Sequence, residues 1–150
     1  GAGLIALSEF SSVLELKTLS LEGKKTDMTI WNGIGAVLML GKLGTLSLKN
    51  AGLGAQGAKR LALELATAPS LSELDLSDND LVNKGSDYSG LIAVAVSLKT
   101  NNALHTIRVD GNGLEATGAV EIAKQMPGWH VKVLSLDQNV LGPPGGAALA

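Results

Sequence analysis

The stretch LSELDLSDNDL at residues 71–81 decides the fold, because its pattern of apolar residues returns in four other places along the chain. Leu71, Leu74 and Leu76 begin it, and Asn79 and Leu81 complete the pattern LxxLxLxxNxL. The other copies place aliphatic residues at the first three positions: Leu16, Leu19 and Leu21; Leu43, Leu46 and Leu48; Leu104, Ile107 and Val109; and Val131, Leu134 and Leu136. The steps between middle residues, from Leu19 to Leu46, Leu74, Ile107 and Leu134, are 27, 28, 33 and 27 positions, which indicates a stacked repeat array.

Each copy predicts a strand followed by a helix. Side chains alternate between the two faces of a strand, so we expect Leu74 and Leu76 to point inward and Ser77 to point outward. A glycine then opens an Ala- and Leu-rich helical segment, as at Gly57 and Gly90. One such unit cannot bury its apolar side alone. Stacking is therefore expected to form a parallel sheet on one side and a row of helices on the other.

An asparagine stands five residues beyond the middle apolar residue in the last three copies, as Asn79, Asn112 and Asn139. Its amide is expected to bond backbone groups in the turn, where the sheet no longer pairs them. Lys24 and Ala51 occupy this position in the first two copies, so we expect these turns either to be distorted or to be paired with something outside this chain.

On these residues the chain resembles the leucine-rich repeat family, and within it the ribonuclease-inhibitor-like subclass, over nearly its whole length. The resemblance implies an α/β fold: a right-handed leucine-rich-repeat solenoid with the parallel sheet on the concave face and the helices on the convex face. We expect a single domain over residues 1–150, with repeats at 16–42, 43–70, 71–103 and 104–130, and partial repeats at 1–15 and 131–150. Neither end reads as a cap, so the chain is expected to be a fragment of a longer array.

Composition favours an intracellular protein, cytoplasmic or in another such compartment. The chain has no cysteine, and hence no disulfide and no thiolate metal site, and it has no Asn-x-Ser/Thr glycosylation site. Its longest apolar runs, 34–40 and 91–98, are far below the roughly 20 residues that cross a bilayer, so no membrane insertion is expected. A net charge of −2 without a basic stripe argues against a nucleic-acid partner.

One motif suggests an enzyme. Gly52, Gly54 and Gly57 fit the G-x-G-x-x-G pattern of dinucleotide-binding turns, and Asp75 follows at a suitable distance. The repeat pattern gives another cause, because residues 111–118 carry similar glycines at the corresponding turn. Dinucleotide binding is therefore a remote alternative. His105 and His130 fall at different places in their repeats, and the acids around Asp75 lack the pattern of a calcium loop, so no catalytic residue, metal or cofactor is expected.

Protein contacts are the expected function, and the sheet offers one surface for them. The outward positions form three columns: Thr18, Thr45, Glu73, Thr106 and Val133; Ser20, Ser47, Asp75, Arg108 and Ser135; and Glu22, Lys49, Ser77, Asp110 and Asp137. Glu73, Asp75, Arg108, Asp110 and Asp137 are the candidate contact residues, and Arg108 is expected to pair with Asp75 on the next strand. Binding hot spots are usually Trp, Tyr or Arg, so a tight concave site is doubtful.

The helical side offers a second surface. Alignment of Gly57 with Gly90 places the wet residues Lys59, Arg60 and Glu64 opposite Ile92, Ala93 and Ser97, and residues 91–96 carry no polar side chain. Two interpretations remain open. These residues pack between neighbouring helices, or Ile92, Val96 and Val120 form a convex contact patch.

Three aromatic residues complete the set of candidates. About five residues near 85–89 are inserted between strand and helix in the third repeat, either as a binding element or as tolerated drift, and they place Tyr88 beside the patch. Trp31 is expected to anchor a second contact, whereas Trp129 is expected to fill a gap in the core.

The sequence therefore predicts a non-enzymatic protein-protein interaction module, or scaffold subunit, of a larger intracellular assembly. The resemblance also implies an alternative, a regulator of a small GTPase that acts through the concave face and uses Arg108. Fold does not choose between them.

Overall fold

A computed structural model describes residues 16–39 and 42–150, and the predicted partial repeat at 1–15 lies outside the described residues. Strand and helix alternate through these residues. The strands are β1 (Thr18–Ser20), β2 (Thr45–Ser47), β3 (Glu73–Asp75), β4 (Thr106–Arg108) and β5 (Val133–Ser135). The helices are α2 (Met28–Met39), α3 (Gly54–Leu65), α4 (Ser89–Ser97), α5 (Glu115–Gln125) and α6 (Gly142–Leu149).

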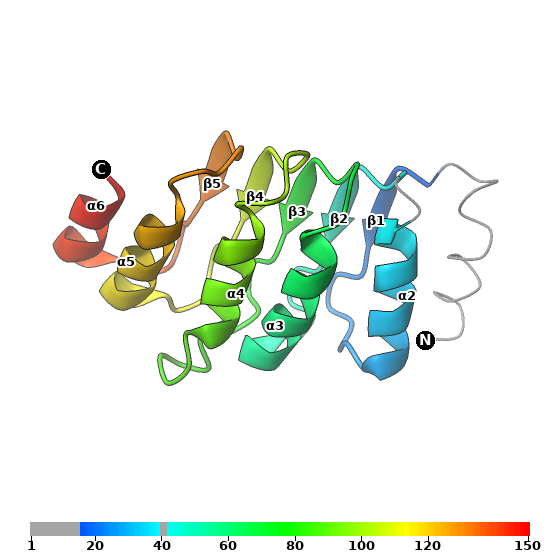
Figure 1. Cartoon of the computed structure of the whole chain (residues 1–150). Coiled ribbons are helices and arrows are strands. Elements are labelled where there is room, and N and C mark those ends of the chain that lie inside the picture. Colours follow the sequence, from blue (N-terminus) through cyan, green and yellow to red (C-terminus); the bar gives the residue numbers. More distant parts are fainter. Residues whose placement is uncertain (1–15, 40–41) are drawn as a thin grey trace.

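The strands form one parallel sheet in the order β1-β2-β3-β4-β5. The helices lie in a row along one face of this sheet (Figure 1). The middle residues of the repeats, Leu19, Leu46, Leu74, Ile107 and Leu134, are partners in register. The first two predicted columns are in register as well, from Thr18 to Val133 and from Ser20 to Ser135. The predicted solenoid, with the sheet on the concave face and the helices on the convex face, is confirmed.

The core lies between the two layers. It contains the inward leucines of the strands together with a buried stripe from each of the helices α2 to α5, such as Leu61 of α3, Val94 of α4 and Ile122 of α5. The prediction that Ser77 points outward is wrong, because the residue is buried, with 4% of its surface exposed. The strand ends at Asp75, so the alternation of side chains ends there too, and the Ser77 carbonyl accepts the Asn50 N–H inside the turn.

The three asparagines form the predicted network, and each one links two repeats. The Oδ1 atom of Asn112 accepts the backbone N–H groups of Asn79 and Leu81 in the preceding repeat, at 3.0 and 3.2 Å. Asn79 and Asn139 make the equivalent pairs of bonds. All three side chains are nearly fully buried. The network therefore satisfies N–H groups that the short strands leave unpaired.

The first two turns replace the missing asparagines by backbone bonds. The Lys24 N–H donates to the Leu21 carbonyl at 3.1 Å, and the Ala51 N–H donates to the Leu48 carbonyl at 3.2 Å as well as to Asn79. The Thr26 N–H donates to the Ala51 carbonyl at 3.1 Å. The first turn is thus held by backbone bonds, whereas the second also bonds the Asn79 side chain of the next repeat.

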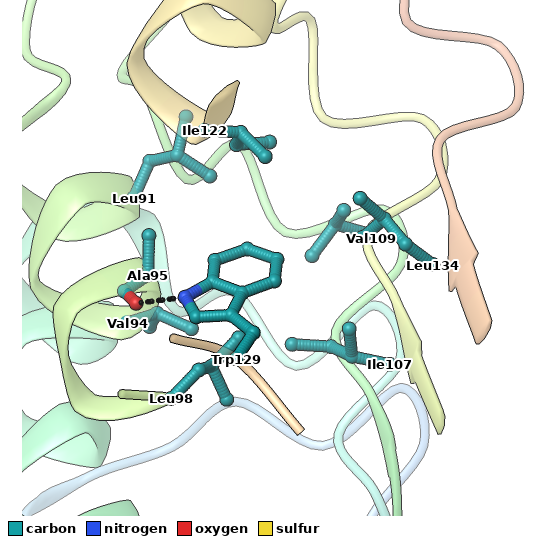
Figure 2. Close-up of a pocket in the computed structure, with 9 residues that line it drawn as sticks. All are labelled: Leu91, Val94, Ala95, Leu98, Ile107, Val109, Ile122, Trp129 and Leu134. Carbon is teal, nitrogen blue, oxygen red and sulfur yellow. Dashed lines mark hydrogen bonds between the residues drawn. The ribbon is translucent and has the colours of Figure 1, made fainter. Parts of the chain in front are cut away.

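A small apolar cavity of about 10 Å³ remains between α4, α5 and the sheet. Figure 2 shows the Trp129 indole across it, with its N–H directed at the Ala95 carbonyl oxygen, 2.9 Å away. The surrounding side chains are aliphatic, among them Leu91, Ile107 and Val109. A space of this size holds at most one water molecule, so it is a packing defect rather than a ligand site. Trp129 contacts the core, as the sequence predicted.

Candidate functional site

The concave face is polar and shallow. A hollow over β2, β3 and β4 is lined by Glu73, Asp75 and Arg108, with threonine and serine between them. Asp75 and Arg108 are partners in register, yet no ion pair joins them among the described residues. The Asp75 carboxylate instead accepts the Ser77 N–H at 2.9 Å, and Arg108 is exposed. The expected Arg108–Asp75 pair is therefore not formed.

The acids at the carboxyl ends of the strands are partly occupied by bonds within the chain. Asp110 accepts the Ser135 hydroxyl at 2.6 Å and the Asp137 N–H at 2.8 Å, while the side chain of Asp137 is exposed. Lys49 and Asp78 form an ion pair at 3.8 Å. In the described part of the chain, no group of three or more acidic, histidine or cysteine side chains is arranged to hold a metal ion. Apart from the exposed Val133, this face offers a partner polar contacts.

The glycines of the nucleotide-like motif serve the turn between strand and helix. Gly52 and Gly54 have positive φ values of 66° and 56°. Gly113 and Gly142 have φ values of 66° and 61° at the same places in later repeats, which matches the repeat explanation. An added Cβ at Gly57 would lie 3.1 Å from Leu53 and 3.3 Å from Trp31, so this glycine permits close packing.

The loop at residues 82–89, which includes the inserted residues near 85–89, caps two helices. The Oδ1 atom of Asn83 accepts the Ala55 N–H at 3.1 Å and thereby caps α3 in the preceding repeat. Asp87 accepts the Ser89 hydroxyl and the Ser89 N–H at the start of α4. These two bonds lower the pKa of the Asp87 carboxyl, slight burial opposes them, and the charge of Lys59 lowers the pKa further. The loop that carries the insertion thus stabilises the starts of α3 and α4.

Two aromatic candidates, Trp31 and Tyr88, are more buried than we expect for residues that contact a partner. Trp31 is 5% exposed and belongs to the core, so the predicted second anchor is corrected. Its ring fills the space beside Gly57, which the sequence did not reveal. Tyr88 is half-buried and packs against the same core, at the edge of the convex face.

The convex face carries an apolar ridge, which we define as Leu63, Ile92, Val96 and Val120. Leu63 is 66% exposed and Val96 is 47% exposed, while Ile92 and Val120 are half-buried. Ile92 and Val96 are one turn apart on the outer side of α4. Leu63 holds on α3 the position that Val96 holds on α4, two residues beyond the buried Leu61 and Val94. Val120 is the equivalent of Ile92 on α5.

The packing interpretation of α4 is correct for its inner side, whereas a contact patch at its outer side stays a prediction. Gly90, Leu91, Val94 and Ala95 are buried between layers and neighbouring helices. Gly90 allows the closest approach, since a Cβ there would overlap the Ala55 carbonyl oxygen of α3. The sequence did not identify Leu63, because its neighbours Lys59, Arg60 and Glu64 indicated a wet face. Its place six residues after Gly57, as Val96 follows Gly90, was the available signal.

The charges around the ridge are mostly paired within single helices. Arg60 bonds Glu64 at 3.2 Å on α3, and Lys124 bonds Glu121 at 2.6 Å on α5. Lys59 and the exposed Lys99 form no ion pair with any described residue. No helix in the described ranges is long and apolar enough to cross a membrane.

Comparison with known proteins supports the fold. Residues 67–85 and 130–150 match a family model described as Leucine Rich repeat. A solved structure titled as the tropomodulin C-terminal domain, from structural genomics of Caenorhabditis elegans, is similar with a TM-score of 0.70. The two sequences are 12% identical, and the similarity covers 99% of this chain and 87% of that one. Among curated proteins, none matches this sequence.

Proposed function

We propose that this chain is a non-enzymatic protein-binding module that joins a larger intracellular assembly through its apolar ridge. The observation that carries the proposal is the pair of exposed aliphatic side chains Leu63 and Val96, which lie at equivalent positions on adjacent helices. When a partner removes such a cluster of aliphatic groups from water, the free energy of the complex is lowered. Ile92 extends the cluster along α4, and Val120 extends it onto α5.

The fold and its family support binding over catalysis. Leucine-rich repeat domains generally mediate contacts between proteins, and the two matching segments extend that expectation to this chain. The repeat spacings of 27 and 28 residues favour the ribonuclease-inhibitor-like subclass within the family. The histidines His105 and His130 are both exposed and lie at different positions in their repeats. The glycines at 52, 54 and 57 have structural roles that need no nucleotide.

A regulator of a small GTPase that acts through the concave face is the second candidate. Arg108 favours it, since this side chain is exposed and forms no ion pair with the described residues. An arginine held toward a partner can contact phosphate or carboxylate groups. The neighbouring Glu73, Asp110 and Asp137 weigh against a phosphate, because their charges are negative.

Gel filtration of cell extract tests the two candidates. We expect the wild-type chain to elute in a large complex and the Leu63→Lys, Val96→Lys variant to elute alone. Val133→Lys is the matched control: Val133 is 52% exposed, as Val96 is 47% exposed, but it lies on the sheet. Circular dichroism checks that each variant folds. If Val133→Lys or Arg108→Ala releases the complex and the ridge variant does not, the contact is concave and this proposal is wrong.

A further inference from the structure

We infer that the apolar ridge receives an amphipathic helix of another protein, whose apolar stripe is flanked by aspartate and glutamate. This inference rests on the proposed function and adds the chemistry of the partner. Three observations support it: the small size of the ridge, the spacing of its side chains and the sign of the unpaired charges beside it.

The small size of the ridge favours a narrow partner. Its members are Leu63, Ile92, Val96 and Val120, two of them only half-buried and two of them exposed. Four partly exposed aliphatic side chains cover much less than the roughly 800 Å² that each partner buries in a standard interface. A single helix laid across the surface needs only a few anchors of this kind.

The spacing of the ridge fits a helix. Ile92 and Val96 are about 6 Å apart along α4, given a rise of about 1.5 Å per residue. Leu63 lies on the adjacent helix, about 8–10 Å away across the face, which is the usual distance between packed helices. An amphipathic helix presents apolar residues at i, i+4 and i+7, at about 6 and 10 Å along its axis. A helix laid across α3 and α4 can therefore place its residues i and i+7 over Leu63 and Val96, which are about 8–10 Å apart.

Two lysines without an ion pair to any described residue lie beside the ridge, and Asp87, whose carboxylate is bonded by Ser89, is the acid near one of them. Lys99 is exposed in the turn directly after α4, three residues beyond Val96, and its N–H donates to the Val96 carbonyl at 3.1 Å. Lys59 is on α3 at the position that Ile92 holds on α4. Asp87 is close enough to Lys59 to feel its charge, but the two form no ion pair. The acids of the outer face, Glu64 and Glu121, already bond Arg60 and Lys124.

A partner with acidic flanks would place a carboxylate near each of these two lysines. Opposite charges at the rim speed association and select the partner. A second copy of this chain fits less well. A twofold contact through the ridge would bring Lys59 and Lys99 of both copies together, and like charges repel. Two lysines with no aromatic residue in the ridge also give little affinity for an anionic membrane.

A displayed peptide library tests the inference on the whole chain. Each peptide is a helix with a fixed leucine stripe at i, i+4 and i+7, and the eight flanking positions are random. Selected clones are expected to carry Asp and Glu at these positions and to bind at least tenfold more weakly to Val96→Lys. They should also bind at least tenfold more weakly to the Lys59→Glu, Lys99→Glu variant. Lys132→Glu, an exposed lysine next to β5, is the control and should bind as wild type does.

Other outcomes overturn the inference. Clones with basic or unselected flanks would show that charge does not choose the partner. Clones that bind Val96→Lys as tightly as wild type would place the site away from the ridge. Binding of the chain to vesicles of anionic lipid, with no peptide selected, would make a membrane the occupant. If the ridge variant still releases the native complex on gel filtration in any of these cases, the proposed function stands and only the partner's chemistry is wrong.

Discussion

Replacement of Asn112 by alanine removes five hydrogen bonds from the buried network, and the structure shows which of them matter most. The side chain donates to the carbonyls of Leu76, Val109 and Asp110 and accepts the N–H groups of Asn79 and Leu81. Each of the three carbonyls keeps another donor. The Leu76 carbonyl still accepts from the Asn79 side chain, and the Val109 carbonyl from the Asn139 side chain. The Asp110 carbonyl still accepts from the Asp78 N–H. The two N–H groups have no other acceptor among the described residues, so they carry the cost.

An unsatisfied buried donor costs about 1–3 kcal/mol, so two of them predict a loss of roughly 2–6 kcal/mol in the free energy of unfolding. A domain has only about 5–15 kcal/mol in total. Urea unfolding followed by circular dichroism at 222 nm measures the change. Asn102→Ala is the control, because Asn102 is exposed, and it should change stability by less than about 0.5 kcal/mol.

Hydrogen exchange adds a residue-level test of the same prediction. The amides of Asn79 and Leu81 should exchange faster in Asn112→Ala, while that of Ala51, which bonds Asn79, should change less. A loss below about 1 kcal/mol, or exchange that rises equally at all three amides, would refute the account of the network.

Three further predictions concern single positions. Gly90→Ala should lower the free energy of unfolding by about 1–3 kcal/mol, because the new Cβ would lie 2.6 Å from the Ala55 Cα, whereas Gly146→Ala, with nothing within 4 Å, should not; urea unfolding compares them. Val140→Asn should stabilise by about 0.5–1 kcal/mol in the same assay, because φ is 51° at Val140 and asparagine tolerates this region; a loss of stability would contradict it. Asp87→Asn should destabilise at neutral pH, because the folded pKa of Asp87 is lowered. That stabilisation is present above the ordinary pKa of about 3.9 and lost as pH falls through the folded pKa, so unfolding measured from pH 7 to pH 2 should converge; a constant difference would be contrary evidence.

The repeat pattern was sufficient to predict the strands, their register and the asparagine network. Each depends on residues at fixed spacing, so one copy informs the next. The prediction that Ser77 points outward is wrong, because β3 has only three residues. The alternation of side chains between the two faces cannot be extended past Asp75 into the turn. The first two turns lack asparagine, and their backbone bonds leave no signal in side-chain identity.

The candidate site was predictable only in part. Ile92 and Val96 were proposed because α4 is apolar on all sides, and Val120 because it lies on the next helix, α5. The different exposure of Val96 and the buried Val94 follows only from the packing of the helices. Leu63 was hidden by charged neighbours. Trp31 and Tyr88 contact residues of adjacent repeats, and Asn83 bonds an N–H 28 positions away, so local sequence could not place them.

Site-specific photocrosslinking in cells tests the central claim most directly. A photoreactive residue is placed at position 63 or 96 on the ridge, or at the comparably exposed position 133 on the sheet. We predict that illumination yields a covalent adduct with another protein from positions 63 and 96 and none from position 133. An adduct from position 133 alone would contradict the assignment of the convex ridge as the binding surface.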